Sequence, residues 1–534
     1  MTVGVTGHRD LRLEEIRPLQ DLVRAKLKEM QGKYRHTPLR LLCSLSSGAD
    51  LLCAGIALEE KLSLLCALPL SLEEYKKDFE GEDLARFEQV LTQADAVFRV
   101  PAAEPLPQDP GRDFWYRQAG IYVAGHCQVL LALWDGAPGR GSGCGTFETV
   151  GFMRQGIGGF QAEPDGAVLH VHAGRQSNNI RSDNSLRLLE DKPGTLAEAL
   201  RLTDLFNRES LPAKQGLPLA PPEVLARTGP LCQELHKLYL RADALSGRYR
   251  DKYLGIMKWL AVISALMVLS FLLYDELAAS LFLPFYGVFL LLSALLLTLG
   301  RRGSYHSRYL QYRVAAEALR VQFFLSAAGI DHNIASSFTW TQKQDSAWVR
   351  GALSSLLSLP CVSGLTPDEM KLYWISQQLA YHEAAQKSGA GKLRISRRGA
   401  NAMLALSIGL FFTAVFLEFL GKPLMAMTIP TGALKPWLLM RGGERFTISA
   451  LIKIFLGGAS AVTLFLTSYY GKLSLERKCT DHHKMASLYR KAGAYCGAGT
   501  CGVEQLFLKI AQEEIIECGN WFSYCLDNPP NMNL

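Results

Sequence analysis

Several common patterns are missing from this sequence of 534 residues, and each absence argues against one class of protein or site. Twelve cysteines occur, but no two have the C-x-x-C spacing of zinc ribbons and dithiol redox sites, so we expect reduced thiols in the cytosol. The net charge is +7, yet no stripe of basic residues alternates with aromatic residues, which argues against nucleic-acid binding. No signal peptide is expected, because a folded-domain pattern starts at residue 2.

Four long, uncharged apolar windows occupy the second half of the chain: 259–273, 277–299, 399–417 and 454–471. About 20 apolar residues cross a bilayer, so we expect four membrane spans. The first reaches this length if it starts near residue 254 and Lys258 extends to the interface. No window has an ionisable residue near its middle, which argues against an ion-coupled transporter.

Basic residues cluster at the outer ends of both predicted hairpins, which fixes their expected orientation. The connection between the third and fourth windows also carries Lys422, Lys435, Arg441 and Arg445, but four clusters outnumber it. We therefore expect both termini in the cytosol and the chain in the inner membrane. The four clusters are Arg248, Arg250 and Lys252; Arg301, Arg302 and Arg308; Lys392, Arg394, Arg397 and Arg398; and Lys472, Arg477 and Lys478.

The membrane half also resembles an internal repeat, in which a basic helix, two spans and another basic helix occur twice. Residues 312–320 compare loosely with 483–490. In the first copy, Glu317 and Arg320 lie one helical turn apart and could pair, although we expect a solvated charged face. A run of small residues in the fourth window would allow close packing on a neighbouring helix. This run contains Gly457, Gly458, Ala459 and Ala461.

Residues 1–230 alternate strand and helix patterns, which predicts an α/β Rossmann-like parallel sheet with helices on both faces. The expected strands are 2–6, 39–44, 62–68, 96–100, 129–134 and 167–172. In such folds, ligands bind at the carboxyl ends of the strands. Glycine and small polar residues follow several of these strands, and the segment 141–146 is glycine-rich, so we expect a phosphate-bearing ligand there. The candidate ligand-binding residues are Gly7, His8, Arg9, Ser46, Ser47, Gly48, Asp50, Asp135, Gly136, Gly143, Gly145, Thr146 and Glu148.

Five segments carry a resemblance to a known superfamily. They are VGVTGHRD (3–10), SLSSGADLLCAGIAL (44–58), ALPLSLEEYKKDF (67–79), HCQVLLALWDG (126–136) and GSGCGTFE (141–148). Together they resemble the SLOG superfamily, which includes the LOG phosphoribohydrolases, the DprA proteins and nucleotide-sensing domains of bacterial defence systems. The hairpin pattern and YRVAAEALR (312–320) resemble SLATT-type membrane effectors.

The glycine segment departs from the P-G-G-x-G-T-x-x-E motif of LOG enzymes. Trp134-Asp135-Gly136 stands where Pro-Gly-Gly would be, and Thr149 replaces the final glutamate. Only Arg117 lies near the position of the enzymes' basic helix. Hydrolysis needs a positioned acid and base, so these losses indicate binding without cleavage. We expect no enzyme, with Glu148 as the candidate catalytic residue if activity persists.

Three weaker patterns indicate structure rather than metal binding or reactivity. His482 and His483 are adjacent on a helix and point in different directions, and their spacing to Cys496 and Cys501 is irregular. His170 and His172 alternate onto one strand face. Cys144 lies near a helix start, where its pKa could fall, but we expect a small packed residue.

The expected domains are a sensor (1–235), a first hairpin with cytosolic helices (236–398) and a second hairpin with C-terminal helices (399–534). The resemblance implies a nucleotide-gated membrane effector of bacterial antiviral defence. Its ligand would be a cyclic nucleotide or ADP-ribose-type messenger made by a partner enzyme, with no other cofactor, and oligomers would permeabilise the bilayer. A membrane-tethered nucleotide N-glycosidase and a nucleotide-regulated channel or transporter are the alternatives.

Overall fold

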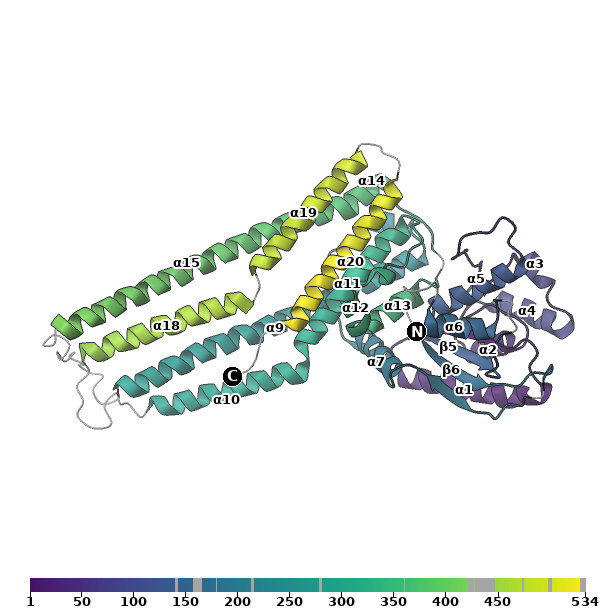
Figure 1. Cartoon of the computed structure of the whole chain (residues 1–534), viewed down its shortest axis with the longest axis horizontal. Coiled ribbons are helices and arrows are strands. Elements are labelled where there is room, and N and C mark those ends of the chain that lie inside the picture. The colour runs from purple at the N-terminus through teal and green to yellow at the C-terminus, as the bar shows by residue number, and fades with distance from the viewer. Residues whose placement is uncertain are drawn as a thin grey trace. The chain divides into compact units, whose positions relative to one another are not determined.

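The computed structural model (Figure 1) describes residues 1–139, 143–156, 166–178, 180–212, 216–277, 281–359, 361–420, 427, 447–472, 475–497 and 502–528. The chain divides into two compact units, neither of which is continuous in sequence. The first contains Met1–Arg241, Val314–Leu365 and Phe507–Ser523, and the second contains Ala242–Arg313, Thr366–Leu506 and Tyr524–Leu534. The three consecutive domains expected from the sequence remain a prediction.

A seven-stranded sheet forms the centre of the first unit, in the order β4-β3-β2-β1-β5-β6-β7. Neighbouring strands from β4 to β6 are parallel, and β7 is antiparallel to β6. The mostly parallel sheet is therefore confirmed, with all six expected strands in place. The strands are β1 (Thr2–Gly7), β2 (Arg40–Cys43), β3 (Ser63–Leu68), β4 (Ala96–Arg99), β5 (Val129–Trp134), β6 (Ala167–His172) and β7 (Leu186–Leu189).

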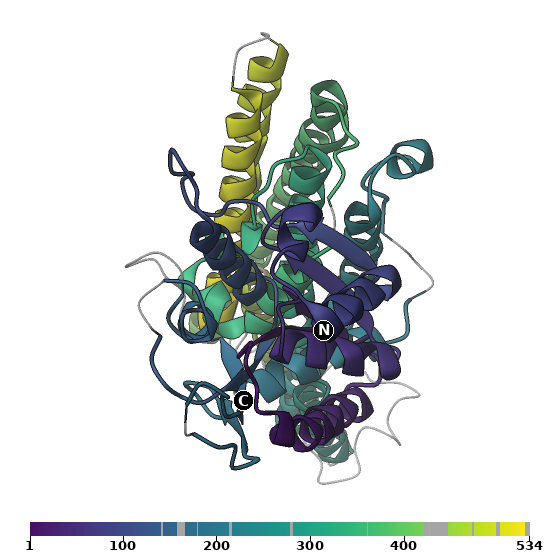
Figure 2. The same ribbon diagram turned by 90° about the vertical axis from the view of Figure 1, so that its right-hand side faces the viewer.

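Helices cover both faces of this sheet, as the alternation of buried residues requires. In β2, Leu41 and Cys43 belong to the core beneath α1, α2 and α4, whereas Leu42 belongs to the core beneath α5 and α6. The sheet and these helices are coloured purple to blue in Figure 2. The helices are α1 (Ile16–Lys33), α2 (Ala49–Glu59), α3 (Leu72–Lys76), α4 (Gly81–Gln93), α5 (Arg112–Gly125) and α6 (Thr146–Gln155), with the short turn η1 (Leu13–Glu15) before α1.

Later segments of the chain pack directly on the sheet domain. The Thr2 hydroxyl of β1 lies 2.5 Å from the Ser355 hydroxyl in the buried interior, and the Phe206 and Trp348 ring centroids are 5.7 Å apart. Residues 314–365 therefore belong to the unit that contains the sheet. The helices involved are α7 (Thr195–Arg208), α8 (Pro222–Leu225), η3 (Ile334–Ser337), α12 (Trp340–Asp345), α13 (Ala347–Leu356) and the parts of α9, α11 and α20 that belong to this unit.

A buried ion cluster joins two distant helices of the first unit, α11 (Tyr305–Ala327) and α20 (Val503–Asp527). The Arg320 guanidinium lies 2.5 Å from Glu317 Oε2 and donates to Glu514 Oε2 at 2.9 Å. All three side chains are at most 10% exposed. The pairing of Glu317 with Arg320 is thus confirmed, but the expected solvated face is wrong, because α20 covers it.

The second unit contains helices with the length and composition of membrane spans. Three segments are long and apolar enough to cross a bilayer: Pro230–Glu276, Phe282–Ala327 and Pro367–Leu417. Within the described side chains, the fourth apolar helix extends only from Ile448 to Thr463, so a fourth span remains a prediction. The helices are α10 (Phe282–Gly303), α14 (Pro367–Met370), η4 (Lys371–Ser376), α15 (Gln377–Leu420), α18 (Ile448–Lys472) and α19 (Leu475–Gly497), together with the remaining parts of α9 (Pro230–Leu277), α11 and α20.

Apolar side chains on these helices remain uncovered by protein. Leu291 is 72% exposed and Phe412 is 65% exposed, as expected for side chains that face lipid. A side chain at Gly457 of α18 would lie 2.8 Å from Leu272 of α9, so this glycine permits the predicted close packing. At Gly458 the adjacent space is open.

We predict that Arg320→Met lowers the free energy of unfolding by about 3–5 kcal/mol, because two buried carboxylates lose their cation. Arg201→Met is the matched control, since Arg201 pairs with Glu198 at the same i,i+3 spacing on the surface. Its loss should cost about 0.5 kcal/mol. A denaturant titration of the full chain in detergent measures both values, and equal losses would contradict the structural role given to the cluster.

Candidate functional site

The reversal of strand order places a cavity where β1 and β5 lie side by side. Parallel sheets of this type bind ligands outside the carboxyl ends of the strands at such a reversal. The cavity has a volume of about 510 Å³ and is bounded by the loops after β1, β2, β3, β5 and β6 and by α5 and α6. Nine predicted residues line it: Gly7, His8, Arg9, Ser46, Asp50, Asp135, Gly145, Thr146 and Glu148. The other four, Ser47, Gly48, Gly136 and Gly143, do not line it.

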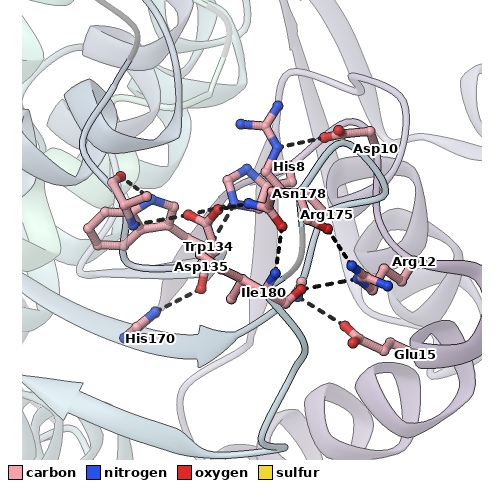
Figure 3. A network of polar contacts seen from close by, with 12 residues as sticks. His8, Asp10, Arg12, Glu15, Trp134, Asp135, His170, Arg175, Asn178 and Ile180 are labelled. Carbon is pink, nitrogen blue, oxygen red and sulfur yellow. Dashed lines mark hydrogen bonds and ion pairs between the residues drawn. The ribbon is translucent and has the colours of Figure 1, made fainter.

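His8 and Asp135 connect the loop after β1 with the loop after β5 (Figure 3). The backbone amide of Asp135 donates to His8 Nε2 at 3.0 Å, and the Asp135 carboxylate lies 3.1 Å from the same nitrogen. Burial lowers the pKa of His8, and the nearby Asp135 charge only partly offsets this effect. His8 is therefore neutral at pH 7. It connects the two loops through a hydrogen bond and does not serve as a cationic anchor for phosphate.

The Asp135 carboxylate is fully engaged by protein groups. Burial disfavours its charge, but the Ala137 amide, His8 and the Asn178 amide together outweigh that effect and lower the pKa of Asp135. The Ala137 amide donates at 3.0 Å and the Asn178 side chain at 2.9 Å. Such a carboxylate orders its surroundings and stays ionised.

The loop after β6 contributes residues that sequence reasoning missed. Arg175 and Asn178 line the cavity, and Arg175 Nε donates to the Asp10 carboxylate at 2.9 Å. Glu15 accepts hydrogen bonds from the backbone amides of Gly174 and Ser182 at 2.9 and 2.8 Å, which ties this loop to the segment after β1. The polar run after the predicted strand 167–172 carried the same signal as the other loops and could have identified them.

Arg9 provides an accessible positive charge at the cavity. Its side chain is 52% exposed, lies 4.9 Å from the centre of the Tyr116 ring and is 4.0 Å from an Asp78 carboxylate oxygen. A guanidinium held over an aromatic ring, with a long contact to one carboxylate, retains donors for a phosphate oxygen. The geometry is therefore compatible with the anion-binding role expected for Arg9.

Two glycines near the cavity leave no room for a side chain. Gly48 has φ +75°, and a side chain there would overlap the Arg9 carbonyl. A side chain at Gly139 would overlap the Glu148 carboxylate. Gly48 thus allows the loop after β2 to meet the loop after β1, although it does not line the cavity itself.

A residue of α5 holds the glycine segment that precedes α6. Arg117 donates from Nη1 to the Gly143 carbonyl at 3.1 Å and forms a two-pronged ion pair with Glu104 at 2.9 Å. Arg117 therefore positions the segment without lining the cavity. Gly141 and Ser142 lie outside the described residues, so the cradle expected from them stays a prediction.

Asp50 is a buried carboxyl group at the start of α2. Burial raises its pKa to about 6, although the Ser46 amide and the Arg9 charge act in the opposite direction. Asp50 lines the cavity together with Glu148, which lies in the first turn of α6. A carboxyl group with this pKa is half-protonated near pH 6 and can exchange a proton in a site.

Three histidines considered in the sequence analysis each contact a different protein group. His482 Nδ1 lies 2.9 Å from His382 Nδ1, whereas His483 Nδ1 lies 3.2 Å from the Gln386 amide. His170 Nε2 lies 2.9 Å from the Trp134 carbonyl. These contacts explain the residues structurally, and Cys501 lies outside the described residues.

We predict that Asp50→Asn changes how stability depends on pH. Folded Asp50 holds its proton more tightly than the unfolded chain, so its contribution to stability is present below pH 4 and is lost as the pH rises through 6. Relative to the native chain, the variant should therefore gain up to about 3 kcal/mol between pH 4 and pH 8.

Unfolding of both proteins across this pH range measures that gain. Asp113→Asn, which removes an exposed carboxylate of the same cavity, is the control for charge alone. If the free energy of unfolding depends on pH in the same way for the native chain and Asp50→Asn, burial does not raise the pKa of Asp50.

Comparison with known proteins gives no further assignment. A scan against models of protein families found no match, and a search of curated protein sequences found none either. Function must therefore be argued from the geometry of this chain.

Proposed function

We propose that the unit containing the sheet binds a nucleotide-derived messenger, and that binding controls the membrane helices of a defence effector. The observation that carries this proposal is the cavity at the strand reversal, which combines an exposed arginine, helix N-termini and aromatic side chains. Arg9 supplies a fork for phosphate, and the start of α6 at Thr146 presents backbone amides. Phe147, 43% exposed and 6.0 Å from the Trp134 ring centre, offers a stacking surface for a base.

The output of such a sensor would be a change in the membrane. The three long apolar helices are compatible with membrane insertion, and helix α9 carries residues of both units. Ligand binding can drive a change only if it favours one conformation over another. We propose that the bound form assembles into oligomers that permeabilise the inner membrane, with a messenger-producing enzyme as the functional partner.

An N-glycosidase is the second candidate, favoured by a specific observation. Asp50, with a pKa of about 6, lines the same cavity as Glu148, and two carboxyl groups in different environments are suited to acid and base roles. Against this candidate, Asp135 and His8 are committed to each other and to neighbouring loops.

We predict that Arg9→Ala weakens binding of the active nucleotide about tenfold or more, because one charge-assisted contact is lost. The measurement is calorimetry on the full chain in detergent with NAD, ADP-ribose, AMP and cyclic dinucleotides. Arg86→Ala is the control, since Arg86 is similarly exposed but lies outside the cavity. Binding that is equal in all three proteins would place the ligand elsewhere.

We predict that Glu148→Gln keeps the toxicity of the full chain when the messenger is supplied. A sensor needs the shape of the cavity, which the amide preserves, whereas an N-glycosidase needs the carboxylate. A voltage-sensitive dye in cells and a nucleotide-breakdown assay on purified protein measure the two outcomes. If Glu148→Gln abolishes both depolarisation and nucleotide breakdown while ligand still binds, the enzyme replaces the sensor.

A further inference from the structure

A second cavity lies in the unit that contains the apolar helices, directly beside the first predicted hairpin. Its volume is about 230 Å³. The cavity is formed by the residues just before the apolar window 259–273 and just after the window 277–299. Three residues of α9 and two of α10 meet the corner that starts α11 there. The lining residues are Tyr253, Ile256, Met257, Gly300, Arg301, Ser304, Tyr305, His306 and Ser307.

A sharp corner between α10 and α11 contributes residues to the lining of this cavity. Ser304 has a left-handed conformation with φ +47°, and its amide donates to the Arg301 carbonyl at 3.2 Å. A side chain at Gly303 would overlap the Tyr305 ring, so glycine allows this ring to fold back on the corner. The Tyr253 and His306 ring centroids are 4.8 Å apart, which joins α9 to α11.

One basic residue lines the cavity, and a second lies against one of its lining residues. Arg301 is exposed, and among the described residues no carboxylate forms an ion pair with it. The Lys252 ammonium lies 5.3 Å from the centre of the Tyr305 ring. Ser304 and Ser307 add hydroxyl groups to the lining. These are the donors that a phosphate monoanion or diester requires.

Part of the cavity lining is apolar and directly precedes the first apolar window. Ile256 and Met257 lie one turn or less from Trp259, which is 59% exposed and begins the first apolar window. An exposed tryptophan at the end of an apolar run is typical of the interface between headgroups and acyl chains. A soluble anion would leave this apolar wall without a partner.

We propose that this cavity binds the headgroup of an anionic phospholipid. Arg301 and the serine hydroxyls hold the phosphate, while Tyr253, Ile256 and Met257 contact the glycerol and the first acyl carbons. The proposal rests on the membrane insertion included in the proposed function, but not on the messenger or on toxicity. The lipid would fix the corner at which α10 leaves the bilayer and α11 begins.

Adjacent arginines offer a matched test of this site. Arg301 lines the cavity, whereas Arg302 is equally basic and exposed but does not line it. Native mass spectrometry of the full chain in detergent counts bound dioctanoyl phosphatidylglycerol, with dioctanoyl phosphatidylcholine as the neutral comparison. Arg301→Gln should weaken phosphatidylglycerol binding about tenfold, and Arg302→Gln less than about threefold.

Met257→Trp keeps the charge but obstructs the apolar wall, and it should weaken phosphatidylglycerol binding to a similar extent. Size-exclusion profiles identify a variant that has lost its fold. In that case the result for the other variant tests the lipid site. Equal losses for Arg301→Gln and Arg302→Gln, or no loss for Arg301→Gln and Met257→Trp, would overturn the proposal.

Two further experiments test whether the ligand is a soluble anion and whether the chain is inserted in the membrane. Inorganic phosphate in tenfold excess should not displace the lipid, and displacement would make the ligand a soluble anion. Carbonate washing of membranes that contain the full chain should leave it in the pellet. Release into the supernatant would overturn membrane insertion together with the lipid site, whereas retention with equal losses would overturn the lipid site alone.

Discussion

The pairing of β1 with β5 is the constraint on which the sheet-containing unit depends. The register runs from Val3 opposite Val129 to Gly7 opposite Leu133, so both strands end at the same level. Gly7 has no side chain, and a Cβ there would lie 2.8 Å from the Leu133 carbonyl and would overlap Ala49. This close approach brings the His8 and Asp135 loops within hydrogen-bonding distance, and the cavity forms around them.

Local pattern was sufficient for most of the sheet. The buried strands are continuous apolar runs bounded by glycine or polar residues, so their positions could be predicted from the local sequence pattern. β7 was missed because it has four residues, of which Arg187 and Leu188 are exposed, and because it pairs antiparallel at the edge. A short edge strand has neither a long run nor a strict alternation to reveal it.

Contacts between distant segments could not be read from the sequence. Glu317 and Arg320 look like a surface pair on their own helix, and only the packing of α20 makes them interior residues. The role of Thr2 as a buried partner of Ser355 is equally invisible, since 353 residues separate them. In the candidate site, the strand ends were predictable, but the engagement of Asp135 by Asn178 depends on where the loop after β6 folds.

The buried cluster around Arg320 can form only late in the synthesis of the chain. Glu514 lies on α20, which follows every apolar helix in the sequence. The sheet can form as soon as its strands have been synthesised, but Arg320 gains its second carboxylate only after the apolar helices have left the ribosome. The sheet-containing unit is therefore completed only after the apolar helices have been made, although all seven of its strands precede them in the sequence.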